Sequence, residues 1–150
     1  MSLSQPPELL HASCVAIHGR GVLLQGPSGA GKSDLALRLI DRGARLVSDD
    51  YTLLHQEDGR LVATAPDNIK DRIEVRGLGI LAMAAAGPAA VALLVALDRT
   101  VARMPPEPCE TRNIAGIDLP VIALAAFEAS APLKVELALD LFGLKDDSDA

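Results

Sequence analysis

Short runs of aliphatic residues, each about the length of a β-strand, recur through the first hundred positions of the chain. The first two, residues 14–18 and 21–25, are separated by Gly19-Arg20, a two-residue connection beginning with glycine that is typical of a tight β-hairpin. The register of such a hairpin places His11 opposite Ser28. The pattern therefore predicts a pair of antiparallel strands near the start of the chain.

Five later runs also predict strands, at residues 44–48, 51–56, 61–65, 73–76 and 91–97. Asp58-Gly59 lies between two of these runs and indicates a second hairpin. Apolar and charged positions alternate in the fourth run, so a strand there sends Glu74 and Arg76 to one face and two apolar side chains to the other.

Two segments follow the period of a helix instead. Residues 34–42 carry four apolar side chains on one helical face, and Gly43 supplies the expected end of that helix. Residues 130–144 predict a second helix, with Ser130 as a candidate N-cap and Pro132 in its first turn. Three leucines of this second helix are spaced four residues apart: Leu133, Leu137 and Leu141.

The chain of 150 residues is long enough for one compact domain. We expect that domain to span residues 9–144, after an irregular lead-in at residues 1–8 and before an acidic tail at residues 145–150. The proline-rich residues 100–120 predict a loop with at most a short helical turn. Hairpins combined with one strand, glycine loop and helix unit favour an α/β fold with a mixed sheet.

Residues 78–97 contain no charged side chain and are long enough to cross a bilayer as a helix. This segment is rich in alanine, which contributes little to membrane insertion, and Gly87-Pro88 divides it into two pieces of strand length. We therefore predict a core strand, a turn and a second core strand here, and no association with a membrane.

The chain has 20 acidic and 14 basic residues, a formal net charge of −6, which argues against broad binding to nucleic acid or to an anionic membrane. A small anionic ligand would then need a local positive site. Cys14 and Cys109 have neither the spacing of a metal site nor that of a disulfide framework, and we interpret both as packing thiols. With no basic and apolar leader at the N-terminus, the expected compartment is the cytosol.

A glycine-rich segment satisfies the P-loop pattern between a predicted strand and a predicted helix. It consists of Gly26, Pro27, Ser28, Gly29, Ala30, Gly31, Lys32 and Ser33. Backbone N–H groups of such a loop converge on phosphate, Lys32 adds a positive charge for the β- and γ-oxygens, and the Ser33 hydroxyl is a ligand for Mg²⁺. The segment predicts a site for a nucleoside triphosphate with Mg²⁺.

Asp49 and Asp50 follow the predicted strand at residues 44–48, where carboxylates often form the second half of a magnesium-nucleotide site. Adjacent side chains at a strand end point to opposite sides, so at most one faces the phosphate squarely while the other caps, pairs or holds metal-bound water. An Asx turn leading into Tyr51 is the alternative for one of them. The predicted hairpin register adds His11 to the same region.

The chain resembles the catalytic domain of HPr kinase/phosphorylase over roughly residues 9 to 140. Three segments carry the resemblance: the P-loop Gly-Pro-Ser-Gly-Ala-Gly-Lys-Ser at residues 26–33, Arg-Gly-Ala-Arg-Leu-Val-Ser-Asp-Asp at residues 42–50, and Glu-Val-Arg-Gly-Leu-Gly-Ile at residues 74–80. The third segment, which includes Arg76, Gly77 and Gly79, is far more specific than the P-loop. His11 also stands where that family has a histidine ahead of its P-loop.

The resemblance implies a fold similar to that of phosphoenolpyruvate carboxykinases, a homohexamer, and transfer of the γ-phosphoryl group of ATP to a serine of the phosphocarrier protein HPr. It implies that Lys32 and Ser33 bind phosphate and Mg²⁺, that Glu74 is a further Mg²⁺ ligand, that Asp50 is the base for the serine hydroxyl, and that Asp49 supports the metal-water network. Arg103 corresponds more weakly to a family arginine that stabilises charge on the moving phosphoryl group.

Two departures from the family pattern bear on function. Typical members carry an additional N-terminal domain that these 150 residues do not contain, so we expect a form similar to the short one of α-proteobacteria. Where the family has Pro-Gly-Arg-Asn, tied to the dephosphorylation direction, this chain has Ala-Ser-Ala-Pro at residues 129–132, which puts phosphorolysis in doubt. A nucleotide-sensing interaction module without phosphotransfer, and a small-molecule kinase, remain the alternatives.

Overall fold

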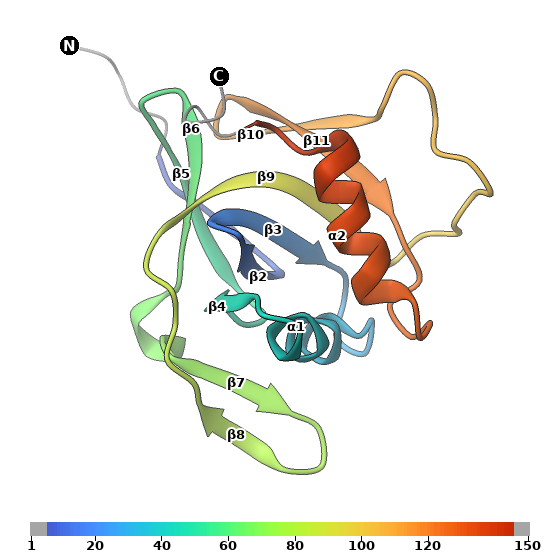
Figure 1. The fold of residues 1–150 in the computed structure, drawn as a ribbon. Helices are drawn as coiled ribbons and strands as arrows, with labels where there is room; N and C mark the ends of the chain where they lie inside the picture. The colour runs from blue at the N-terminus through green and yellow to red at the C-terminus, as the bar shows by residue number, and fades with distance from the viewer. Residues whose placement is uncertain (1–5, 146–150) are drawn as a thin grey trace.

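A computed structural model describes residues 6–145, which form a curled mixed β-sheet, two α-helices and a small two-stranded arm (Figure 1). The strands are β1 (Glu8–Leu10), β2 (Ala12–Ile17), β3 (Arg20–Gln25), β4 (Arg45–Ser48), β5 (Thr52–Glu57), β6 (Arg60–Thr64), β7 (Arg72–Val75), β8 (Gly79–Ala82), β9 (Ala89–Ala96), β10 (Thr111–Ile114) and β11 (Ile117–Ala123). The helices are α1 (Lys32–Asp41) and α2 (Ala131–Phe142), and Asp67–Ile69 form a 3-10 turn.

The main sheet has the order β1-β5-β6-β9-β3-β2-β4. One edge of β9 is shared, because β6 pairs with its first two residues and β11 with Leu94 to Ala96. The β5–β6 hairpin and the β10–β11 hairpin therefore pair with different parts of the same strand, and the sheet curls. The predicted mixed α/β sheet with hairpins is confirmed, and β1 begins at Glu8, one residue inside the expected lead-in.

The carboxyl ends of four strands lie at one edge of the sheet. β3, β9 and β11 run parallel and end level, since Gln25 pairs with Ala96 and Ala96 with Ala123. β4 runs in the same direction, because β3 and β4 both pair antiparallel with β2. Ligands of open α/β sheets bind outside such carboxyl ends, so this edge brings together the segments that follow the four strands.

Buried aliphatic side chains fill two cores, one on each side of the sheet. α1 and α2 cover the first, and the curl of β5, β6, β10 and β11 covers the second (Figure 1). β3 shows the alternation, because Val22 and Leu24 face the helices and Leu23 faces the opposite core. Cys14 is fully buried in the second core, and this burial raises the pKa of its thiol to about 12.

The first hairpin forms in a different register from the one predicted. Its turn is His18-Gly19, both with positive φ, and Ala12 pairs with Gln25, so each partner is shifted by two residues. A type I′ turn needs positive φ at both central residues, and His18 adopts φ +49° to meet this need. The second hairpin, around Asp58-Gly59, forms as predicted.

The uncharged residues 78–97 form β8 and β9 and the segment between them. β9 is buried as expected, but the prediction of a core strand is wrong for β8, which is exposed throughout because it pairs only with β7. Among residues 6–145, no helix has the length and apolar character needed to cross a membrane.

The predicted loop at residues 100–120 is also partly wrong, because its second half, from Thr111, pairs as β10 and the start of β11. Pro120 lies within β11, opposite Thr111. The prolines of the segment concealed this hairpin, since proline inside a run argues against a strand unless the strand lies at an edge or beside an irregular pair.

The predicted C-terminal helix exists as α2, but the Ser130 side chain makes no capping hydrogen bond. The three leucines spaced four apart are exposed, whereas Val135, Ala138 and Leu139 pack into the helix-side core. Positions two apart on a helix are separated by about 200°, so Leu137 and Leu139 point in nearly opposite directions. α2 therefore carries one buried and one exposed apolar stripe.

We predict that Leu139→Ala costs about 2–5 kcal/mol of unfolding free energy, since Leu139 is 1% exposed and its removal leaves a cavity. The matched variant is Leu137→Ala, whose side chain is 59% exposed and which should change stability by no more than about 0.5 kcal/mol. Urea unfolding followed by circular dichroism measures both. Equal losses for the two variants would contradict the orientation of α2.

Candidate functional site

The glycine loop ends where α1 begins, and Gly31 is the residue that allows this junction. Gly31 has φ +96° at the N-cap of α1, a conformation that side chains other than glycine's rarely adopt. A Cβ atom added there would lie 2.9 Å from the Ala126 Cβ and 3.1 Å from two ring carbons of Phe127. The loop after β11 therefore packs directly against the glycine loop, and only glycine fits between them.

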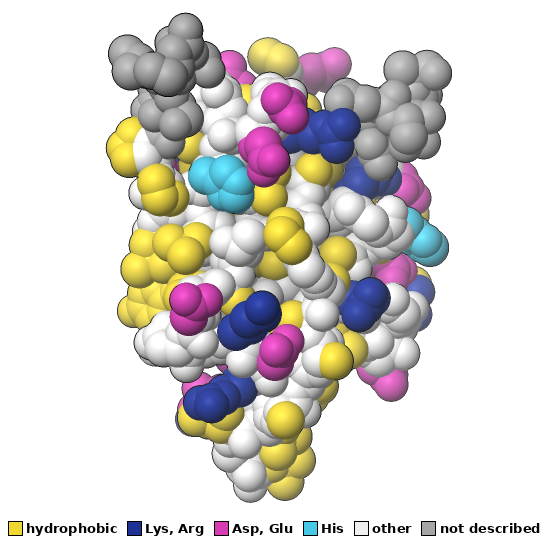
Figure 2. All heavy atoms as spheres, turned by 90° about the vertical axis from the view of Figure 1, so that its left-hand side faces the viewer, with side chains coloured by type: hydrophobic (Ala, Val, Ile, Leu, Met, Phe, Trp, Pro, Cys, Tyr) yellow, Lys and Arg dark blue, Asp and Glu magenta, His cyan; other side chains and the backbone are white. Residues whose placement is uncertain are grey.

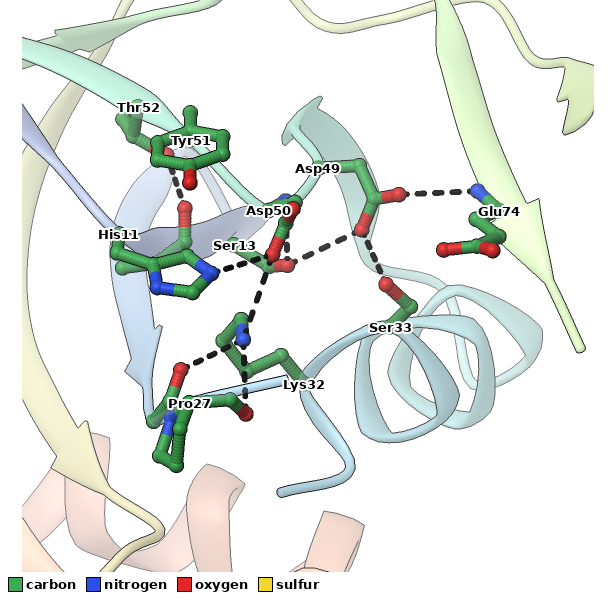
Figure 3. A network of polar contacts seen from close by, with 12 residues as sticks. His11, Ser13, Pro27, Lys32, Ser33, Asp49, Asp50, Tyr51, Thr52 and Glu74 are labelled. Atoms are coloured by element: carbon green, nitrogen blue, oxygen red, sulfur yellow. Dashed lines mark hydrogen bonds and ion pairs between the residues drawn. The ribbon is translucent and has the colours of Figure 1, made fainter. Parts of the chain in front are cut away.

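Lys32 is the first residue of α1 and is only 4% exposed. Its Nζ donates hydrogen bonds to the carbonyl oxygens of Gly26 (2.6 Å) and Pro27 (3.2 Å) and lies 3.4 Å from Asp50 Oδ1 (Figure 3). The ammonium charge is thus held between the start of the glycine loop and the carboxylate that follows β4.

A sharp turn immediately after β4 directs Asp50 into this region. Asp50 has φ +67°, and the Tyr51 N–H donates to the Asp49 carbonyl at 2.7 Å, so three residues reverse the chain. The Ser48 hydroxyl donates to the Tyr51 carbonyl and supports the turn. Non-glycine residues with positive φ are strained and concentrate at functional sites. Because of the turn, both neighbouring carboxylates reach the polar network rather than one pointing away.

His11 lies between β1 and β2 and contacts the same carboxylate. Its Nε2 is 2.8 Å from Asp50 Oδ1, and its ring stacks on Tyr51 with centroids 4.7 Å apart and planes 12° from parallel (Figure 3). The expectation that His11 lies beside the glycine loop rested on pairing opposite Ser28, and that pairing is wrong. His11 instead reaches the loop through Asp50 and Lys32.

Asp49 is buried and occupies the centre of a second set of hydrogen bonds. Its Oδ1 accepts from the Ser13 hydroxyl (3.1 Å) and the Ser33 hydroxyl (2.5 Å), and its Oδ2 accepts from the Glu74 N–H (2.9 Å). Ser13 is fully buried in β2, and its oxygen also accepts the Asp50 N–H at 2.9 Å. Asp49 therefore joins β2, α1 and β7, and Ser13 links the two aspartates.

A cavity of about 720 Å³ opens over the start of α1. It is lined by Ser28, Gly29, Gly31, Lys32, Ser33, Asp34, Leu37, Asp50, Glu74, Val75, Arg76 and Phe127. Asp50 therefore faces the cavity, with a side chain 45% exposed. Asp49 is buried, does not line the cavity and is linked to Asp50 through Ser13. The cavity lies within the size range of small-molecule sites.

The comparisons with known proteins point in one direction. Residues 3–100 match the family model for the HPr serine kinase C-terminal domain. This chain belongs to that family. The HPr kinase/phosphorylases of Geobacillus sp. (strain WCH70) and of Bacillus velezensis are 49% identical over 79 residues and 51% identical over 77 residues. Each match covers about half of this chain and 25% of the relative, so the chain spans a quarter of their length.

A solved structure agrees with the family. The HPr(Ser) kinase/phosphatase of Coxiella burnetii superimposes with a TM-score of 0.74 at 31% identity, covering 89% of this chain and 94% of that one. The curled mixed sheet is therefore the fold of this HPr kinase family domain. The family model ends at residue 100, before the loop that contains Arg103.

The structure brings most of the predicted HPr kinase residues together, but not all in the predicted way. Gly26 and Pro27 contribute carbonyl oxygens to Lys32 and lie outside the cavity lining, and Ala30 lines a neighbouring cavity. Arg103 is exposed in the segment between β9 and β10 and lines neither cavity. Its role in charge stabilisation stays a prediction.

Gly77 and Gly79 form the turn of the arm made by β7 and β8. Both have positive φ, the Leu78 N–H donates to the Val75 carbonyl at 2.9 Å, and a Cβ at either glycine meets no atom within 4 Å. They are needed for the turn that follows Glu74 and Arg76.

The donor set fits Mg²⁺ bound together with a phosphate ligand. Ser33, Asp49, Asp50 and Glu74 offer hydroxyl and carboxylate oxygens, the ligands that Mg²⁺ prefers, and the Glu74 carboxylate lies on the same side as Ser33 (Figure 3). Among the described residues no three His, Cys, Asp or Glu side chains converge as a metal site of their own. Mg²⁺ commonly takes one or two carboxylates and completes its shell with phosphate and water.

Three residues of the site were missed by sequence reasoning: Ser13, Tyr51 and Phe127. Ser13 is a polar residue inside a run of otherwise apolar strand positions, and this was the available signal. Tyr51 and Phe127 gave no periodic signal, since their positions depend on a turn and on a loop after β11.

We predict that Ser13→Ala costs about 1–3 kcal/mol of unfolding free energy, because it leaves the Asp50 N–H and one oxygen of the buried Asp49 short of a partner. The control is Ser130→Ala, which removes a hydroxyl that makes no capping hydrogen bond and should change stability by about 0.5 kcal/mol or less. Urea titration measures both, and a Ser13→Ala protein as stable as the control would show that the link is not needed.

Proposed function

We propose that this chain is a Mg²⁺- and ATP-dependent protein-serine kinase that transfers the γ-phosphoryl group of ATP to a serine of HPr. The observation that carries the proposal is the position of Asp50. Its carboxylate lines the cavity beside the glycine loop, 3.4 Å from Lys32 Nζ and 2.8 Å from His11 Nε2. A base at the phosphate end of a nucleotide site is the element that phosphoryl transfer to a hydroxyl requires.

In this proposal each residue has a separate task. Asp50 accepts the proton of the incoming serine hydroxyl, and His11 holds the carboxylate in place through its 2.8 Å contact. The Lys32 ammonium already lies beside the glycine loop, where it contacts loop carbonyls and Asp50. When a triphosphate binds, Lys32 exchanges these contacts for phosphate oxygens. Ser33 and Glu74 would hold Mg²⁺, with Asp49 supporting the metal-bound water, and the ion offsets negative charge on the triphosphate when bound. Arg103 would act only if its exposed loop approached the site.

A protein substrate suits this site better than a small molecule. Asp50 is half-exposed at the mouth of the cavity, so a serine on another protein has access to it. The arm of β7 and β8, which includes Glu74, projects from the main sheet (Figure 1) and carries exposed apolar side chains at Leu78 and Ile80. Acidic and basic side chains are interspersed on the face shown in Figure 2, without the basic patch of a nucleic-acid site.

Three further properties belong to the same proposal. We expect a homohexamer, measurable as the mass of the protein in solution, and residence in the cytosol, consistent with the free thiols of Cys14 and Cys109. We also expect phosphorolysis of phosphoserine-HPr to be weaker than the kinase reaction, because residues 129–132 depart from the family pattern. Phosphate-dependent loss of label from phosphoserine-HPr measures this reverse step.

Purified HPr incubated with Mg²⁺ and γ-labelled ATP tests the proposal directly. Label should reach an HPr serine with the wild-type chain, and Asp50→Asn and Lys32→Met should each lower the rate by about 10²–10⁴-fold, the range for loss of a general base or a preorganised charge. The matched control is Asp140→Asn, an exposed aspartate far along the chain in α2, which should retain the wild-type rate.

The outcomes separate the alternatives. ATP binding without label on HPr would indicate a nucleotide-sensing module, and label on a small metabolite instead of HPr would indicate a small-molecule kinase. Full activity in Asp50→Asn would remove Asp50 as the base while leaving the kinase assignment standing.

A further inference from the structure

Phe127 is exposed and lines the cavity from the loop after β11, whereas Asp50 reaches it from the turn after β4. It is one of only three aromatic residues in the chain, and 71% of its surface is accessible. Single exposed apolar residues are common and need no explanation by themselves. Phe127 differs because its ring lines the cavity over the glycine loop and also borders a second cavity of about 420 Å³ next to Ala30 and Leu97.

The position of Phe127 is fixed by contacts on both sides of it. The Arg38 guanidinium of α1 donates to the carbonyl oxygens of Ala126 and of Glu128 (3.1 Å), and its Nε is 3.0 Å from Asp34. Gly31 lies against the edge of the ring, where a Cβ would come within 3.1 Å of two ring carbons. The ring is therefore held beside the first turn of α1, with most of its surface free.

The direction in which the proposed ligand lies follows from the residues at the two ends of the site. Lys32, Asp50 and Glu74 gather where the segment after β4 meets the glycine loop, so the reacting end of a triphosphate belongs there. The loop that contains Phe127 follows β11. In the strand order β11 lies two strands from β3, on the opposite side of β3 from β4. A triphosphate that lies across the start of α1 therefore brings its nucleoside toward Phe127.

We propose that Phe127 is the platform on which the base of a nucleoside triphosphate stacks, an inference that rests on the proposed kinase function. Aromatic side chains stack on any base, because every base has a π-face, and loss of one such platform weakens binding by roughly 5- to 150-fold. The ligand class is a nucleoside triphosphate, and its phosphates are recognised separately by the glycine loop. Phe127 is then a binding residue and takes no part in proton or phosphoryl transfer.

The test compares two ligands that share phosphates but not a base. Calorimetry measures binding of ATP and of inorganic tripolyphosphate, each with Mg²⁺ and without HPr, to the wild-type chain and to Phe127→Ala, Phe127→Tyr and Leu141→Ala. We expect Phe127→Ala to bind ATP at least about 5-fold more weakly while tripolyphosphate affinity changes less than 2-fold. Phe127→Tyr should retain ATP affinity, and Leu141→Ala, an equally exposed apolar residue on α2, should match wild type for both ligands.

Two outcomes would overturn the stacking platform while the kinase proposal stands: unchanged ATP affinity in Phe127→Ala, or equal losses for ATP and tripolyphosphate, which would mean that Phe127 only shapes the glycine loop. Failure of the wild-type chain to bind either ligand would instead overturn the proposed function, and the platform with it.

Discussion

The ammonium group of Lys32 is buried, and the arrangement of the site follows from what that charge requires. An isolated buried ammonium is costly, so Nζ must find acceptors and a counter-charge nearby. The carbonyls of Gly26 and Pro27 provide the acceptors, which bends the glycine loop back over the start of α1. Asp50 provides the counter-charge from 3.4 Å, which is possible only because the chain turns sharply after β4.

The turn after β4 depends in part on Ser13, a residue that has no direct chemical role in the proposed reaction. Asp50 adopts a positive φ, and its N–H is satisfied by the buried Ser13 hydroxyl rather than by a strand partner. The same hydroxyl donates to Asp49, whose other bonds reach Ser33 and the backbone of Glu74. Strain at one residue is thus offset by a set of hydrogen bonds that spans three elements.

The sequence allowed the prediction of whatever depends on local pattern. The P-loop between strand and helix, the hairpin at Asp58-Gly59 and the end of α1 at Gly43 all formed as expected. Long-range consequences were not predictable in the same way. The exposure of β8 and the strand pairing of Pro120 depend on which neighbours a segment finds. The two-residue shift of the first hairpin has a local cause, the positive φ of His18, which a non-glycine residue rarely adopts. For α2 the pattern singled out Leu133, Leu137 and Leu141, but the buried stripe is that of Val135, Ala138 and Leu139, which depends on contacts with the rest of the fold.

The two ends of the cavity differ in chemistry because they derive from different parts of the sheet. Segments after β3 and β4 bring the ammonium, the Asp50 carboxylate and the Ser33 hydroxyl, and β7 adds Glu74, whereas the loop after β11 brings an aromatic ring and backbone carbonyls already bound by Arg38. The first end offers an anionic group the Lys32 ammonium, and the second offers an uncharged planar group the exposed surface of Phe127. A ligand that combines both groups would therefore bind in a single direction, which keeps its anionic terminus beside Asp50.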